Sequence, residues 1–249
     1  MMTNELLMLA VIPVVILLVY IYHKDPVEKE PGKLLALLLM WGVLSIIPVI
    51  LLEGAGITLL QYWPYYDLTF LLLENFLVIA LVEEGCKFFF LWWRTWKNPA
   101  FDYAFDGIVY AVFVSMGFAL AENIGYVFEY GFYTAVFRSF TAIPGHCVFA
   151  VFMGYFYAQA AAARVDGNAS KVRSNMLLAV FVPMLCHGTY DVLATINDEV
   201  TLAIFFVFLI AMVAVGISMV RREARKARRL VEPVLAEPTL PDSLPDDVM

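Results

Sequence analysis

Residues 76–93 read FLVIALVEEGCKFFFLWW, an almost unbroken apolar stretch with Glu83, Glu84 and Lys87 at its centre. A helix needs about 20 mostly apolar residues to cross the roughly 30 Å of a bilayer's hydrocarbon core. Ionisable side chains at such a depth are costly to insert and are therefore candidates for function. This stretch predicts a membrane-spanning helix that carries part of a polar site.

The composition of the whole chain indicates a membrane protein. Of its 249 residues, 62% are hydrophobic and 16% are charged, whereas soluble proteins average about 45–50% and about 25%. A soluble domain of this size cannot bury that much apolar surface in one core. The composition excludes a soluble enzyme and a disordered chain, and the three cysteines, all in apolar segments, do not describe a disulfide scaffold.

Segments of similar length and hydropathy recur along the chain. They predict an all-α, polytopic transmembrane helix bundle with about seven spans. The expected spans are residues 6–22, 34–52, 68–93, 103–128, 134–161, 176–193 and 200–220.

The distribution of basic residues predicts the orientation of this bundle. Fourteen of the 16 Lys and Arg residues lie in alternate connections or after the last span, and the opposite set of segments holds none. Because basic residues beside spans stay cytoplasmic, the pattern predicts an N-terminus outside and a C-terminus inside. The other two, Lys87 and Arg138, fall within spans, and we expect Arg138 to extend its side chain to the outer interface.

The C-terminal part differs from the rest in charge and composition. We expect residues 1–230 to form one transmembrane domain and residues 231–249 to form an acidic, Pro-rich, disordered cytoplasmic tail. Six basic residues between Arg221 and Arg229 are predicted to bind anionic lipid headgroups rather than nucleic acid.

Polar side chains recur inside the predicted spans. The candidate catalytic residues are Glu83, Glu84, Lys87, Glu122, Asn123, His146, His187 and Asp191. Helical spacings of three and four residues place Lys87 beside both glutamates, and they let Asp191 accept a hydrogen bond from His187. Buried carboxylates combined with imidazoles are typical of a hydrolytic site. Asp106, near the start of a span, is expected to be a helix cap.

Two other functions would use the same residues. A proton-coupled transporter or channel could relay protons through the buried Glu and His side chains, although the sequence shows no internal repeat. A membrane scaffold without catalytic activity could bind partner helices through faces of small residues.

Four motifs follow one another along the chain. They are Glu83-Glu84-x-x-Lys87, Phe118-x-x-x-Glu122-Asn123, Pro144-Gly145-His146 and His187-Gly188-x-Tyr190-Asp191. With these motifs the chain resembles the PrsW family of intramembrane proteases, within the wider group of CAAX-prenyl endopeptidases and bacteriocin-processing enzymes. In the CAAX branch the second motif ends in His, so Glu122 favours PrsW. The resemblance implies that residues 1–230 form a protease domain in a bacterial plasma membrane, which cleaves membrane-anchored proteins such as anti-sigma factors at their outer side.

The resemblance leaves two mechanisms open. In one, either glutamate of the first motif activates water directly, and His146 or His187 stabilises the oxyanion or protonates the leaving amine. In the other, a divalent metal such as zinc is held by Glu122, His146 and His187, and a glutamate of the first motif remains the base. The spacing of these ligands is not diagnostic of a metal.

Overall fold

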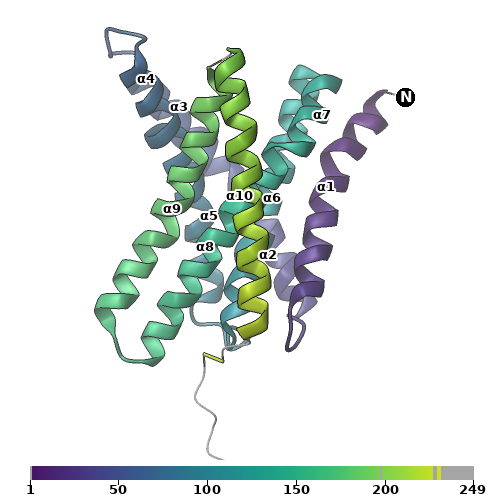
Figure 1. Ribbon diagram of the computed structural model, residues 1–249, viewed down its shortest axis with the longest axis vertical. Coiled ribbons are helices and arrows are strands. Elements are labelled where there is room, and N and C mark those ends of the chain that lie inside the picture. The colour runs from purple at the N-terminus through teal and green to yellow at the C-terminus, as the bar shows by residue number, and fades with distance from the viewer. Residues whose placement is uncertain (1, 197, 227–228, 231–249) are drawn as a thin grey trace, which may run out of the picture.

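The computed structural model describes residues 2–196, 198–226 and 229–230, and every named element within them is a helix (Figure 1). The elements are α1 (Met2–Lys24), α2 (Gly32–Leu44), α3 (Ile46–Leu60), α4 (Leu68–Leu72), η1 (Leu73–Ala80), α5 (Leu81–Thr95), α6 (Ala104–Tyr130), α7 (Phe132–Phe140), α8 (Ala142–Val165), α9 (Ala169–Thr195) and α10 (Glu199–Lys226). The predicted all-α class is confirmed. The predicted acidic tail, residues 231–249, lies outside the described residues.

Six helical segments in the described residues are long and apolar enough to cross a membrane. They are Leu7–Lys24, Gly32–Leu60, Ala104–Tyr130, Phe132–Val165, Ala169–Thr195 and Glu199–Lys226. Each overlaps one predicted span, and Gly32–Leu60 extends beyond the predicted end at residue 52. The remaining predicted span, residues 68–93, is helical throughout but is divided into α4, η1 and α5, none of which alone could cross. The chain is a multi-pass helical membrane protein, and the orientation of its termini stays a prediction.

The element η1 is a π-helix, a wider form than the α-helix that is rare and often found at functional sites. It leads directly into α5, whose first turn contains Glu83 and Glu84. Because each π-turn takes up an additional residue, η1 changes the direction in which the glutamate pair points relative to α4. A hydropathy pattern does not contain this information.

The helix α6 lies at the centre of the bundle and packs against both α2 and α8. Its residues 104–119 are all buried, which explains why this helix is apolar on every side. A Cβ atom at Gly42 or Gly117 would overlap the backbone of the opposite helix, α6 or α2. The α6–α8 crossing depends in the same way on Gly107 and Gly154. Small residues therefore set the distances between the central helices.

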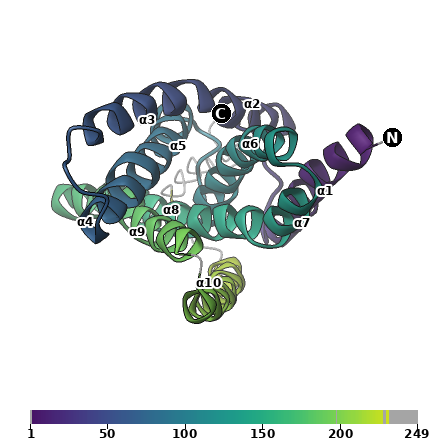
Figure 2. The same ribbon diagram turned by 90° about the horizontal axis from the view of Figure 1, so that it is seen from above.

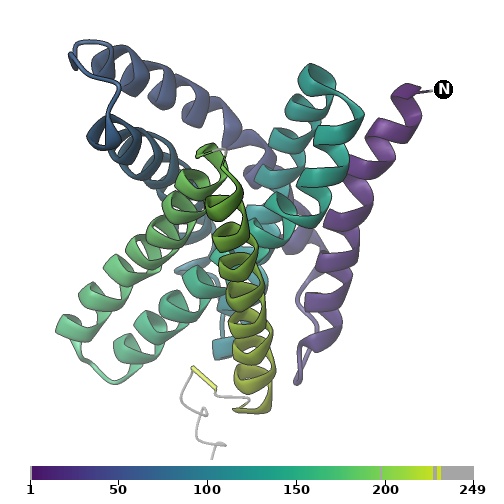
Figure 3. The same cartoon turned by 45° about the horizontal axis from the view of Figure 1, so that its top comes forward.

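The outer helices surround this centre. Seen from above, α10 lies outside the ring of the other helices (Figure 2), and it packs against α8 and α9 through Phe205, Leu209 and Met212. At one end of the bundle α3 and α4 lean away from α7 (Figure 3). Between them α5, α6, α8 and α9 pack against one another, and these four helices carry the polar candidates.

Candidate active site

Four helices bring the sequence-predicted residues together. Glu83, Glu84 and Lys87 come from α5, Glu122 and Asn123 from α6, His146 from α8, and His187 and Asp191 from α9. All except Glu122 and Asp191, which are partly exposed, are buried. The close approach of α9 to η1 requires glycine at position 188, because a Cβ there would overlap the ring of Phe76.

The ammonium of Lys87 is completely buried and holds the glutamate pair together. Its Nζ donates to Glu83 Oε2 at 2.9 Å and to Glu84 Oε1 at 2.8 Å. The same atom lies 3.2 Å from His146 Nδ1 and 4.1 Å from the centre of the Phe118 ring. Because an ammonium can only donate, the network assigns the acceptor role to His146 Nδ1 and the proton to Nε2.

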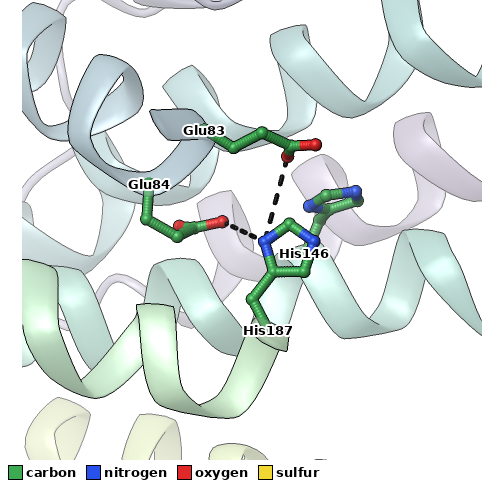
Figure 4. Close-up of side chains that lie close together, drawn as sticks. All are labelled: Glu83, Glu84, His146 and His187. Atoms are coloured by element: carbon green, nitrogen blue, oxygen red, sulfur yellow. Dashed lines mark hydrogen bonds and ion pairs between the residues drawn. The ribbon is translucent and has the colours of Figure 1, made fainter. Parts of the chain in front are cut away.

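From α9, His187 contacts the same glutamate pair. Its Nδ1 lies 2.9 Å from Glu84 Oε1 and 3.9 Å from Glu83 Oε2 (Figure 4). Its Nε2 lies 3.3 Å from Asp191 Oδ2, one helical turn further on. That carboxylate oxygen makes no hydrogen bond, so the predicted hydrogen bond from His187 to Asp191 is present only as a close approach.

On the opposite side, Glu122 joins His146 to Arg138 of α7. Glu122 Oε2 accepts from His146 Nε2 at 2.9 Å and from Arg138 Nη2 at 2.7 Å. Arg138 Nε also donates to Asn123 Oδ1 at 3.0 Å. The prediction that Arg138 reaches the outer interface was wrong. The chain reverses at Gly131, where φ is +81°, so α7 packs against α6 and its arginine reaches Glu122.

A cavity of about 330 Å³ opens onto this network. Its charged and imidazole lining residues are Glu83, Glu122, Arg138, His146, His187 and Asp191. Glu84 and Lys87 do not line it. The volume lies within the range of pockets that bind small ligands, so the polar residues face a space large enough for a ligand.

Part of the network forms a group that could hold a metal ion. One ligand atom each from Glu83, Glu84, His146 and His187 lies within 4.8 Å of the others, and all four residues are buried. Glu84 Oε2 is buried without a hydrogen-bond partner and is therefore free to coordinate. Carboxylates and imidazoles are the ligands of many catalytic zinc sites. The predicted ligand set shares both histidines with this group, whereas Glu122 lies outside it.

Sequence reasoning missed two charged residues and placed a third correctly. Arg138 contacts Glu122 and Asn123 of the site. The sequence feature that could have indicated this is that Arg138, like Lys87, lies within a predicted span and not in a cytoplasmic connection. Glu53, expected in a connection, lies in α3 with Oε1 buried and unpartnered. Asp106 is a cap as predicted, because its Oδ2 accepts from the backbone N–H groups of Tyr103 and Asp102 at 2.7 and 3.1 Å.

Comparison with known proteins finds one family. A family model described as PrsW family intramembrane metalloprotease matches residues 30–231. A Protease PrsW from Clostridioides difficile is 30% identical over 234 residues, which cover 92% of this chain and 95% of the relative. Proteins of that name from Oceanobacillus iheyensis and Bacillus subtilis are 34% and 31% identical, over 75% and 74% of this chain and 81% and 79% of theirs. No solved structure matches significantly.

These similarities agree with the geometry of the site. The chain is a peptidase of the bacterial cell membrane that acts on membrane proteins, and the transporter alternative receives no support. The metalloprotease description of the family agrees with the buried group of carboxylates and imidazoles. The chain belongs to the PrsW family of intramembrane metalloproteases.

Proposed function

We propose that this protease hydrolyses a peptide bond of a membrane-anchored protein in the 330 Å³ cavity, with Glu83 as the general base. The observation that carries the proposal is that Glu83, and not Glu84, lines the cavity. A base must reach the water from which it takes a proton. Glu84 is fully buried, and its Oε1 accepts hydrogen bonds from Lys87 and His187.

The remaining residues are assigned by their contacts. Lys87 offsets the negative charge of the glutamate pair, and Glu83 can return the proton taken from water to the leaving amine. Both imidazoles turn Nδ1 toward the glutamate–lysine cluster and Nε2 toward an outer carboxylate, Glu122 or Asp191. Carboxylate partners of this kind are typical of histidines that bind metals.

The donor set fits a divalent metal such as zinc. We assign the ligand role to Glu84, His146 and His187, which leaves Glu83 as the base. A metal in this set would supply Lewis acidity toward water and the scissile carbonyl. The orphan Glu84 Oε2 supports this assignment. Glu84 Oε1 and His146 Nδ1 also contact the ammonium of Lys87, so these two ligand residues already stabilise a positive charge.

The position of the cavity supports cleavage at the outer side of the membrane. Thr134 and Phe137 of α7 and Thr195 at the end of α9 line it, and the predicted orientation places these segments toward the outside. We infer that the substrate is cut at its outer side, as the resemblance implies for anti-sigma-factor-like proteins.

We also infer that the basic segment after the last span contacts anionic lipid headgroups. The side chains of Arg222 and Lys226 are 56% and 50% exposed, although both lie beside Glu223. Basic side chains at this position relative to a span are attracted to anionic headgroups.

The test uses purified full-length protein in detergent and a membrane-tethered peptide substrate. Glu83→Gln should lower turnover at least about 100-fold, the range that general-base catalysis contributes, while bound metal stays unchanged. His187→Ala should lose both metal and activity. The matched control Glu74→Gln, in η1 and outside the cavity lining, should keep both. Normal turnover in Glu83→Gln would refute its role as base, and metal retained by His187→Ala would refute the ligand set.

A further inference from the structure

A second cluster of buried carboxylates lies apart from the active site. Asp25 and Glu30 belong to the α1–α2 connection, and Asp106 belongs to the first turn of α6. One oxygen from each lies within 4.8 Å of the others, and the three residues are only 8%, 5% and 2% exposed. Three carboxylates at this separation repel one another strongly unless positive charge or protons offset them.

The described residues provide little compensation. No Lys, Arg or His in that part of the chain forms an ion pair with any of the three carboxylates. Lys29 lies nearby, but its ammonium donates to the backbone carbonyls of Tyr22 and Asp25. The charged state of the cluster thus lacks a partner.

One carboxylate of this cluster carries an oxygen without a hydrogen-bond partner. Asp25 is more than nine-tenths buried, and its Oδ2 makes no hydrogen bond, while its Oδ1 accepts only a 3.4 Å bond from the Val27 N–H. Leaving a buried carboxylate oxygen unpaired costs free energy. By contrast, Glu30 accepts from the Tyr110 hydroxyl, and Asp106 caps α6. The Asp25 side chain makes only the 3.4 Å bond to Val27, so its second oxygen is available to a ligand.

We propose that Asp25, Glu30 and Asp106 form a second metal site, for a hard divalent cation, Mg²⁺ or Ca²⁺. Oxygen-only ligands are those that these ions prefer, whereas the active-site group includes imidazoles. The cation would fasten the α1–α2 connection to the start of α6. The adjacent Asp102 carbonyl accepts the Leu230 N–H, so the described C-terminal end lies beside the same place.

Luminescence of Tb³⁺, excited through aromatic side chains, tests the proposal in metal-stripped full-length protein. The wild type should bind Tb³⁺, and Ca²⁺ or Mg²⁺ should displace it. Asp25→Asn should weaken binding at this site at least about tenfold, the loss that even an outer-shell change causes. Glu28→Gln, an exposed carboxylate in the same connection, is the matched control and should bind as the wild type does. Glu84→Gln, which alters the active-site group, should keep this signal.

Equal Tb³⁺ affinity in the wild type and Asp25→Asn, or no displacement by Ca²⁺ or Mg²⁺, would overturn the proposal and indicate that protons offset the charges. Thermal unfolding provides a readout that does not depend on the folding of Asp25→Asn. The Tm of the wild type and of Glu28→Gln should rise with added Ca²⁺ or Mg²⁺. A Tm that does not respond to either cation would also overturn the proposal.

Discussion

At the scale of single residues, the guanidinium of Arg138 offsets the charge of the Glu122 carboxylate inside the bundle. Their side chains are 14% and 15% exposed, and Glu122 in turn holds His146. Removing one partner of a buried pair leaves an uncompensated charge. Arg138→Met should therefore lower the free energy of unfolding by about 3 kcal/mol, the lower end for buried pairs because some exposure remains. It should also lower kcat about tenfold or more through the loosened imidazole.

Unfolding in detergent and turnover of a tethered substrate measure these effects. The double variant Arg138→Met with Glu122→Gln should recover much of the stability but not the activity, because it removes the orphan charge without restoring the support of His146. Arg173→Met, which changes an exposed arginine of α9, is the control and should leave both quantities unchanged. Full activity of Arg138→Met would show that the arginine has no part in positioning the site.

The sequence predicts those candidate site residues whose ionisable side chains are costly to bury in a membrane. Glu83, Lys87 and His187 stand out because each is ionisable within an apolar stretch. Which glutamate is the proposed base and which the proposed metal ligand could not be predicted, because the assignment depends on which carboxylate lines the cavity. Arg138 was misjudged because its contact with Glu122 depends on how α7 packs against α6 after the turn at Gly131, and the position of a residue along the chain does not show this packing.

At the scale of helices, the apolar stretches predict the elements well because a bilayer requires one long apolar helix for each crossing. The π-helix η1 could not be predicted, since its backbone hydrogen bonding leaves no trace in residue type. The breaks within spans were also missed. Residues 34–52 appear as one span, yet α2 ends at Leu44 and α3 begins at Ile46. The intervening Ser45 directs its hydroxyl to the Gly42 carbonyl, a contact that bends helices.

The α2–α6 crossing yields a prediction at this scale. A Cβ at Gly117 would overlap the Leu39 carbonyl and lie 3.1 Å from Gly42 Cα, and backbone cannot move aside as a side chain can. Gly117→Ala should therefore lower the free energy of unfolding by about 1–3 kcal/mol, the usual cost of overpacking. Gly125→Ala on the same helix is the matched control, because nothing lies within 4 Å of its added Cβ. It should be neutral or stabilising, since alanine favours a helix. Thermal unfolding of both variants decides, and equal stability would contradict the close crossing.

At the scale of the whole molecule, the polar residues of the site come from four helices that are distant in sequence. The sequence could predict that these residues lie within spans, but not that α5, α6, α8 and α9 converge while α10 stands outside. Counting residues predicts how deep a side chain lies along its span. Which helices lie beside one another depends instead on packing at glycines such as Gly107 and Gly154.

The orientation of the whole molecule determines on which side a substrate is cut. Basic residues predict that the α3–α4 connection is outside and that the α8–α9 connection is cytoplasmic. In intact cells, a membrane-impermeant maleimide should label Tyr66→Cys, whose position is 85% exposed, above the background of the native cysteines. Lys171→Cys, exposed in the first turn of α9, should be labelled only after the membrane is permeabilised. The opposite labelling pattern would show that the orientation of the bundle in the membrane is the reverse of the predicted one. The cavity residues of α7 and the end of α9 would then face the cytoplasm, and substrates would have to be cut at their inner side.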